Sequence, residues 1–497
     1  MSIRYSQDTS KPSTAEDSSR LRRVTLPSMG LRVSERRLLL GFMDFALLLA
    51  ALAIALSLRT ELLPEFRQLF VSWKWVVTLA VVWFAYAALF NIYNLARAAS
   101  TIYSIRSAAL AALLASFTYL LIPWFTPALI NRSQGYLFVL LSVLFIIIWR
   151  GAYAQLFTQP TFQRRSIILG STPGAQALVV ALRSNFARED ANPFRGTGHI
   201  LLGFVYSNGQ EDEELVAELP VLGQAKDLVR LTKELEVDEV ILSLPQKAEM
   251  GQALYEAILD CHELGIHMTK MSTVYERLTG RVAVEYAGGD VEMVAGIDDS
   301  AFYRFYAAAK RLIDIFSGFV GLLVMMVIIP PILLLNALSS PGPLFYRQQR
   351  VGQGGKPFRV IKFRSMKLDA EENGAVWAEI DDDRVTLVGK WLRRLHLDEI
   401  PQVINVLKGD MSLVGPRPER SDFVGILARE IPYYRARHSV RPGITGWAQI
   451  HQDYGSSIDD ARVKLEYDLY YIKKISLWLD LVIMLRTVTR VLGLHGR

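Results

Sequence analysis

An apolar run interrupted by two adjacent prolines constrains the fold of this chain more than any other feature. The run covers residues 312–338, and about 20 apolar residues suffice for a helix to cross a bilayer. Pro330 and Pro331 lie about two-thirds of the way along it. Each proline lacks a backbone N–H and clashes with the preceding turn, so a straight helix cannot continue through the pair. We therefore predict a re-entrant helix over about 310–338 that enters the membrane, bends at the prolines and leaves on the same side.

The composition indicates an integral membrane protein. Hydrophobic residues make up 51% of the 497 residues, and they are concentrated in long runs. The net charge is +6, with much of the basic excess beside apolar segments, which favours lipid headgroups rather than nucleic acid as the partner. No basic and aromatic pattern of a nucleic-acid module is present. The single cysteine, Cys261, excludes an internal disulfide and a cysteine-built metal site.

Four apolar segments precede the broken run, at 38–58, 73–93, 107–125 and 135–149, and they predict a four-helix transmembrane region over 36–160. Residues 1–35 lack the apolar core of a signal peptide and are predicted to be a disordered basic tail. Asp44 is expected to have a structural role, hydrogen-bonded or ion-paired near the membrane interface. By the positive-inside rule, the tail and the chain after the fourth segment face the cytoplasm. The arginines that support this orientation are Arg20, Arg22, Arg23, Arg32, Arg36, Arg37, Arg97, Arg106, Arg150, Arg164 and Arg165.

Residues 161–298 alternate between strand and helix patterns. Strands are predicted at 166–169, 200–206, 239–244 and 266–270, and helices at 176–183, 225–235 and 252–264. This alternation predicts a parallel, doubly wound, Rossmann-like domain. The turn after the first strand, residues 170–175, departs from G-x-G-x-x-G, so we expect a degenerate nucleotide-binding fold without a nicotinamide cofactor.

The chemistry is concentrated around Asp398 and Glu399, where a short helix is predicted to begin. Arg393 lies upstream, and Arg417 lies downstream in a turn held rigid by Pro416 and Pro418. Arginines near a helix N-terminus suit phosphoryl oxygens. Carboxylates in a phosphate site call for Mg²⁺, and an aspartate can attack phosphorus to form an acyl-phosphate. Without these neighbours, Asp398 could be no more than an N-cap.

These motifs resemble the bacterial sugar transferase family, the monotopic phosphoglycosyl transferases that act on polyprenyl phosphate. The resemblance covers the domain 299–497, and the preceding parts resemble, by architecture, the long branch that primes exopolysaccharide, capsule and O-antigen synthesis. The matching segments are Lys310-Arg311-x-x-Asp314, Lys362-Phe363-Arg364-Ser365-Met366, Leu397-Asp398-Glu399-x-Pro401-Gln402, the run from Asn405 to Pro418, Arg441-Pro442-Gly443-Ile444-Thr445-Gly446 and Tyr467-Asp468-x-x-Tyr471.

The resemblance implies an enzyme of the bacterial inner membrane whose catalytic domain faces the cytoplasm. Such an enzyme transfers a sugar-1-phosphate from a UDP-sugar to undecaprenyl phosphate, with UMP as the second product. It also implies a nucleophile at Asp398, which forms a covalent phosphosugar intermediate, and a Mg²⁺ ligand at Glu399. Glucose, galactose and N-acetylated sugars all remain open as substrates, and pairing of two copies is compatible with the long branch.

Basic residues would hold the substrate phosphates. By the same resemblance, Arg393 and Arg417 would bind phosphate oxygens, while Lys362 and Arg364 would be further phosphate contacts. For Lys362 and Arg364 a supporting role in the fold remains equally open. Asp410 and Asp468 are expected to cap or pair with nearby basic residues.

Other interpretations of these residues predict other functions for the protein. Asp381-Asp382-Asp383 could be the D-x-D motif of a metal-dependent membrane glycosyltransferase, which would release UDP, or a solvated turn. A non-catalytic membrane scaffold, in which the sheet domain binds a regulatory ligand, and an oxidoreductase that uses that domain are the remaining alternatives.

Overall fold

The computed structural model describes residues 33–57, 73–93, 98, 101–127, 132–156, 164–170, 173–184, 199–206, 219–244, 252–284, 301–367, 384–452 and 457–491. These residues form a membrane bundle (33–156), a sheet unit (164–284) and a C-terminal unit (301–491). The expectations for the basic tail up to residue 32 and for Asp381-Asp382-Asp383 lie outside the described residues.

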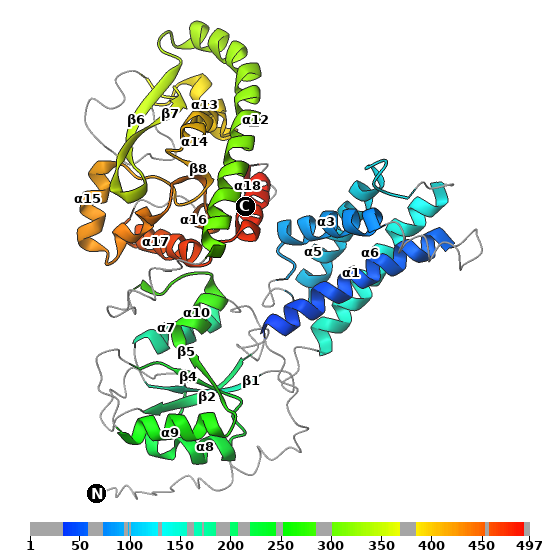
Figure 1. Cartoon of the computed structure of the whole chain (residues 1–497), viewed down its shortest axis with the longest axis vertical. Coiled ribbons are helices and arrows are strands. Elements are labelled where there is room, and N and C mark those ends of the chain that lie inside the picture. The colour runs from blue at the N-terminus through cyan, green and yellow to red at the C-terminus, as the bar shows by residue number, and fades with distance from the viewer. Residues whose placement is uncertain are drawn as a thin grey trace, which may run out of the picture.

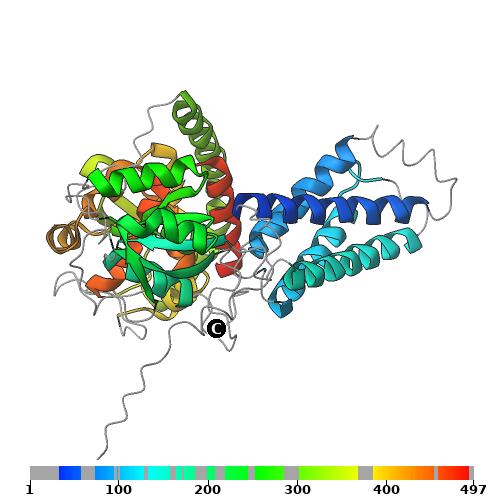
Figure 2. The same cartoon turned by 90° about the horizontal axis from the view of Figure 1, so that it is seen from below.

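The membrane bundle consists of α1 (Val33–Ser57), α3 (Trp73–Leu89), α5 (Thr101–Leu120) and α6 (Arg132–Leu156), which match the four predicted segments. Figures 1 and 2 show these four helices packed together as one bundle. Alanines and leucines at the helix contacts, together with Trp83 and Phe138, form a buried core between them. Within the described residues, four helices are long and apolar enough to cross a membrane: α1, α5, α6 and α12. Helix α3 is apolar but has only 17 residues.

A fully buried ion pair fastens two of these helices. Arg150 on α6 donates to both carboxylate oxygens of Asp44 on α1, at 3.2 and 2.5 Å, and to the carbonyl of Ile92 at 2.9 Å. Asp44 is therefore paired, as expected, but with a residue 106 positions away rather than with the neighbouring arginines. Removing one partner of such a pair typically costs about 3–5 kcal/mol, because it leaves an uncompensated buried charge.

The sheet unit is a five-stranded parallel sheet in the order β3-β2-β1-β4-β5, which confirms the predicted doubly wound fold. The strands are β1 (Arg164–Leu169), β2 (His199–Tyr206), β3 (Val221–Gln224), β4 (Glu239–Leu242) and β5 (His267–Lys270). Helices α7 (Pro173–Ser184) and α10 (Met271–Thr279) cover one face. Helices α8 (Leu228–Glu234) and α9 (Gln252–Glu263) cover the other, and the short helix η4 (Ala225–Asp227) precedes α8 (Figure 1).

The C-terminal unit is mostly helical. Its long first helix is α12 (Ala301–Ser339), followed by the antiparallel hairpin of β6 (Phe345–Val351) and β7 (Pro357–Phe363), with η6 (Gln353–Gly355) between the strands. Strands β8 (Ser412–Val414) and β9 (Gly443–Thr445) pair in parallel. The remaining elements are α13 (Leu387–Arg394), η7 (Leu397–Gln402), α14 (Val403–Lys408), α15 (Ser421–Glu430), η8 (Tyr434–Ser439), α16 (Trp447–His451), α17 (Ile458–Lys473) and α18 (Leu477–Val491).

Helix α12 contains both prolines of the broken run and remains helical through them. Figure 1 shows this helix bending near its C-terminal end, in the part that contains the prolines, so it is not the straight span that its length would allow. The return to the same side of the membrane stays a prediction. Gly318 and Gly321 let α14 approach closely, because a Cβ at either position would lie within 2.7 Å of Leu407 or Val403.

The last residues of the sheet unit, near Val282 and Val284, join the core of the C-terminal unit. Val282 and Val284 are buried among Leu465, Leu469 and Ile431, and the Val282 N–H donates to the carbonyl of Glu466 at 3.1 Å. Just before these valines in the chain, Glu276 pairs with Lys473 at 2.7 Å and the carbonyl of Gly280 accepts from the Trp447 indole at 2.9 Å. The sheet unit is thus fastened to α16 and α17.

Candidate functional site

The acidic pair lies at a sharp corner between two helices. Helix α13 ends at Arg394, and His396 adopts a left-handed conformation (φ 54°) before η7 begins at Leu397. Asp398 therefore occupies the first turn of η7, while His396 is the residue at the N-cap position. The N-cap alternative for Asp398 is not what the structure contains. The next helix, α14, ends at Gly409, which has a φ of 89°.

The corner is anchored to the strand that precedes it in the chain. The Asn405 side chain on α14 accepts from the Ile361 N–H at 3.1 Å and donates to the carbonyl of Arg359 at 2.8 Å. This two-way amide contact ties β7 to α14, the helix that follows η7 directly. As a result Lys362, on β7, faces the acidic pair.

Glu399 is bound by two cations from different elements. Lys362 Nζ lies 2.7 Å from Glu399 Oε1, and Arg417 donates to Oε1 at 2.5 Å and to Oε2 at 3.2 Å. Burial by itself would raise the pKa of Glu399, but the Arg417 and Lys362 cations outweigh it and hold that pKa well below its usual range. Glu399 is therefore a carboxylate at neutral pH.

Asp398 is more deeply buried, with only 7% of its surface exposed. Burial raises the pKa of Asp398 above its ordinary value, Lys362 opposes the rise, and the negative charge of Glu399 adds to it. Burial likewise lowers the pKa of Lys362, although Glu399 counteracts that effect. The two adjacent carboxylates consequently differ in proton affinity and can carry different tasks.

The other two predicted phosphate contacts are placed differently. Arg393, in the last turn of α13, donates through Nε to the Ser365 hydroxyl at 3.1 Å and lies close enough to Asp398 to lower its pKa. Arg364 is turned toward the end of α12, where it donates to the carbonyl of Pro343 at 2.9 Å, to Asn336 Oδ1 at 2.7 Å and to the carbonyl of Ser340. The structure thus gathers Asp398, Glu399, Lys362, Arg417 and Arg393, and leaves Arg364 outside this cluster.

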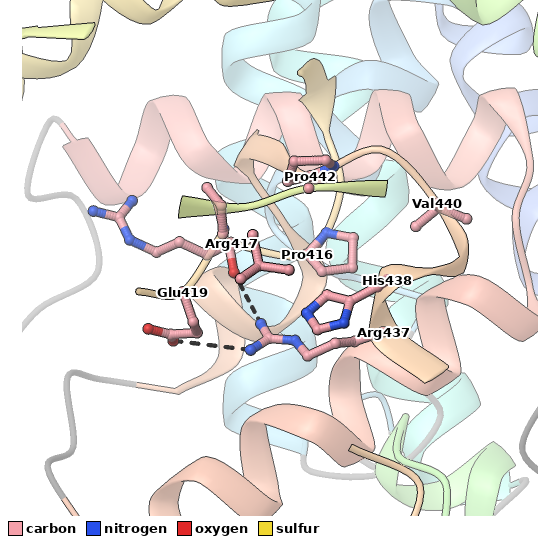
Figure 3. Close-up of a pocket in the computed structure, with 10 residues that line it drawn as sticks. Pro416, Arg417, Glu419, Arg437, His438, Val440 and Pro442 are labelled. Carbon is pink, nitrogen blue, oxygen red and sulfur yellow. Dashed lines mark hydrogen bonds and ion pairs between the residues drawn. The ribbon is translucent and has the colours of Figure 1, made fainter. Parts of the chain in front are cut away.

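A small pocket lies beside the turn that carries Arg417 (Figure 3). Pro416, Arg437, His438 and Pro442 are among its lining residues. In Figure 3 the Arg417 side chain extends away from Arg437, while its backbone carbonyl accepts from the Arg437 guanidinium at 2.9 Å. Burial lowers the pKa of His438 to about 4, so this imidazole is neutral at physiological pH.

Sequence reasoning did not single out Arg437. This side chain is buried and donates to Asp468 Oδ2 and to the Tyr434 hydroxyl, both at 2.7 Å. The expected pairing of Asp468 with a basic residue is confirmed, and Asp410 accepts a long hydrogen bond from Asn405 at 3.4 Å. A charged residue in an irregular segment carries no periodic signal, so Arg437 could be found only through its tertiary partners.

The two carboxylates at this site fit a Mg²⁺ ion that would be shared with the substrate. Among the described residues, no group of three or more histidine, cysteine, aspartate or glutamate side chains could hold a metal ion. Magnesium, however, is often bound by one or two carboxylates together with substrate phosphates and water. Asp398 and Glu399 supply hard oxygen ligands of that kind, so the residues fit a metal whose coordination is completed by the substrate.

Two family models match this chain. The model described as bacterial sugar transferase matches residues 305–493, which include all of the residues gathered at the acidic pair. The model described as CoA-binding domain matches residues 88–252, from the end of α3 into the sheet unit.

Curated relatives agree with the first model. The chain is 44% identical over 236 residues to UDP-N-acetylgalactosamine-undecaprenyl-phosphate N-acetylgalactosaminephosphotransferase of Aeromonas hydrophila, covering 48% of this chain and 55% of the relative. It is 34% identical over 287 residues to UDP-glucose:undecaprenyl-phosphate glucose-1-phosphate transferase of Xanthomonas campestris pv. campestris, covering 55% and 57%. The matches thus span little more than half the length of these two relatives.

A third relative is covered more fully. UDP-glucose:undecaprenyl-phosphate glucose-1-phosphate transferase of Caulobacter vibrioides is 42% identical over 189 residues, which make up 37% of this chain and 69% of the relative. The family model, the relatives and the acidic pair among its basic residues lead to the same conclusion: this chain belongs to the bacterial sugar transferase family.

Proposed function

We propose that this protein transfers a sugar-1-phosphate from a UDP-sugar to undecaprenyl phosphate. The observation that carries the proposal is the adjacent pair of Asp398 and Glu399, with Lys362 and Arg417 bound to Glu399 and Arg393 nearby. The relatives named for N-acetylgalactosamine and for glucose support this reaction class and keep both kinds of sugar open.

In the first step, an oxygen of the Asp398 carboxylate attacks the phosphorus that bears the sugar. The bond from that phosphorus to the bridging oxygen of the diphosphate breaks, and UMP leaves with the electron pair. The sugar phosphate is then held on Asp398 as an acyl-phosphate, which divides one difficult transfer into two easier ones. Burial raises the pKa of Asp398, and the Lys362 cation opposes that rise and so favours the ionised form that attacks.

In the second step, a phosphate oxygen of undecaprenyl phosphate attacks the same phosphorus and displaces the Asp398 carboxylate. The products are undecaprenyl-diphosphate-sugar and the free enzyme. Arg417, Arg393 and Lys362 would hold phosphoryl oxygens in both steps, because guanidinium and ammonium groups stabilise the charge that develops on them.

Glu399 would hold Mg²⁺ together with the diphosphate of the donor. The metal, when bound, supplies charge neutralisation on the phosphate oxygens. In the structure Glu399 is occupied by Lys362 and Arg417. Entry of a diphosphate would let these two cations move their hydrogen bonds from Glu399 to the phosphate oxygens, which frees the carboxylate for the metal.

The location proposed for this reaction is the cytoplasmic face of the bacterial inner membrane. The arginines that flank the membrane bundle favour this orientation, and α12 would re-enter on the same side through its bend at Pro330 and Pro331. Arg364 supports the C-terminal end of α12, because it donates to two backbone carbonyls and to a side-chain amide oxygen there. Such acceptors cost several kcal/mol each if they are left unsatisfied in lipid.

The deciding experiment measures nucleotide release by the purified protein from a panel of UDP-sugars, with undecaprenyl phosphate and Mg²⁺. We expect UMP with one or two of the sugars, and a mass increase of one sugar phosphate on the protein when the acceptor is withheld. The Asp398→Asn variant should lose both signals, with turnover down by more than about 10³-fold, whereas the exposed Asp422→Asn control should keep them. Release of UDP instead would move the protein to the glycosyltransferase class.

A further inference from the structure

The turn that carries Arg417 is held in place by hydrogen bonds that other elements donate to its backbone carbonyl oxygens. Four consecutive carbonyls each accept a hydrogen bond from another element: Pro416 from the Gly443 N–H at 2.9 Å, Arg417 from Arg437 at 2.9 Å, Pro418 from Arg350 at 3.1 Å and Glu419 from the Val351 N–H at 3.0 Å. Pro416 and Pro418 have no N–H to donate. The position of this backbone therefore depends on what binds its carbonyls.

Two of these four donors are guanidinium groups that reach the turn from different elements. Arg350 extends from β6 and Arg437 from η8, and both approach the Glu419 carboxylate, at 3.8 and 3.9 Å. Arg437 is in turn oriented by Asp468 and Tyr434, each at 2.7 Å. The side chain of Arg437 is only 4% exposed, so its charge is compensated inside the protein and not by solvent.

We propose that Arg437 and Arg350 are positioning residues for the transfer reaction: they fix the backbone of residues 416–418 so that the Arg417 guanidinium reaches Glu399 and the donor phosphates. The inference rests on the function proposed above. Neither arginine touches the acidic pair in the structure. Their effect passes through the peptide groups at 417 and 418 to a side chain that makes two hydrogen bonds to Glu399, at 2.5 and 3.2 Å.

A positioning role has a consequence that a purely structural role lacks. If Arg437 acts through Arg417, its contribution to the rate disappears once Arg417 has been removed. If Arg437 only stabilises the fold, its loss changes the rate by the same factor with or without Arg417. A double-mutant cycle separates these cases, because residues that act through one another are non-additive while independent ones add.

The experiment uses the full-length protein and the variants Arg437→Gln, Arg417→Gln and their combination, with kcat/KM measured for UMP release and the thermal midpoint recorded for each. We expect Arg437→Gln to lower kcat/KM by about 10–100-fold in the native background and by less than about 2-fold in the Arg417→Gln background. The thermal midpoint should fall equally in both. Equal rate factors in the two backgrounds would overturn the inference.

Two further variants complete the design. Arg350→Gln removes the other guanidinium, whose side chain is 20% exposed, and the same non-additivity with Arg417→Gln is expected if Arg437→Gln does not fold. Lys473→Met is the matched control: Lys473 lies on α17 with Asp468 and pairs with Glu276, and it is not one of the four donors to the turn, so its effects should add. Native activity in Arg417→Gln alone would count against the proposed phosphate site. Reduced activity in Arg417→Gln with additive behaviour of both Arg437→Gln and Arg350→Gln would overturn the positioning role alone.

Discussion

At the scale of single residues, the Lys362 cation favours the ionised form of the proposed nucleophile, Asp398. Burial raises the pKa of Asp398, and Lys362 is the largest influence that opposes the rise. Removing that charge in Lys362→Met should raise the pKa of Asp398 further, so a smaller fraction is ionised at any given pH. We expect the acidic limb of the pH profile of kcat to move up by about 1 unit or more. Lys362→Arg, which keeps the charge, should leave the limb in place, and an unmoved limb in Lys362→Met would contradict this assignment.

The same residues illustrate what the sequence could predict about the site. Asp398, Glu399 and Arg417 stand in short motifs, and each was identified from its neighbours in the chain. The ion pair between Lys362 and Glu399 spans 37 positions and depends on how Asn405 ties β7 to α14. Lys362 and Arg364 have the spacing of one strand face. Strand β7 ends at Phe363, however, so Arg364 leaves the strand and turns toward α12.

At the scale of elements, the proposed re-entry of α12 would keep the C-terminal unit on the cytoplasmic side of the membrane. Replacing Pro330 and Pro331 together by alanine restores two backbone donors and removes the clash with the preceding turn, so the helix should straighten and a fraction of molecules should span. A cysteine at the exposed position Gln353, with the buried Cys261 replaced by alanine, reports the side by labelling of sealed vesicles of either orientation. In the native background we expect labelling from the cytoplasmic side alone, and in the double variant from both sides. A label that stays entirely cytoplasmic in the double variant would refute this account of the bend.

Elements with a strong local pattern were the predictable ones. The apolar helices and the strands β1, β2, β4 and β5 were located from periodicity, whereas β3 and α10 were not. Strand β3 has four residues and contains Gly223, whose positive φ of 158° departs from a regular strand pattern. Helix α10 follows β5 without any intervening residue, so no turn signal separates the two. The helix expected at the acidic pair proved to be a six-residue 3₁₀ turn before α14, because Pro401 interrupts regular α-helical hydrogen bonding there.

At the scale of the whole molecule, the border between the sheet unit and the C-terminal unit does not coincide with the change in sequence texture near residue 299. Val282 and Val284 precede that point by more than a dozen positions, yet their side chains are 0% and 2% exposed in the core of the C-terminal unit. The Val282 N–H also closes a hydrogen bond to α17 at Glu466. A C-terminal fragment that begins at residue 299 would therefore lack part of its own core.

Two fragments test this border. A fragment of residues 280–497 keeps Val282 and Val284, whereas 299–497 loses both, and burial of a valine side chain contributes roughly 1.5–3 kcal/mol. We expect the longer fragment to have the higher thermal midpoint and, if the proposed function holds, to release UMP more rapidly in detergent or vesicles. In the full-length chain, Val282→Ala with Val284→Ala should lower the midpoint of the C-terminal unit, while Val221→Ala, at an exposed position on β3, should not. Equal midpoints for the two fragments would mean that these valines belong energetically to the sheet unit, because the C-terminal unit would then be complete without them.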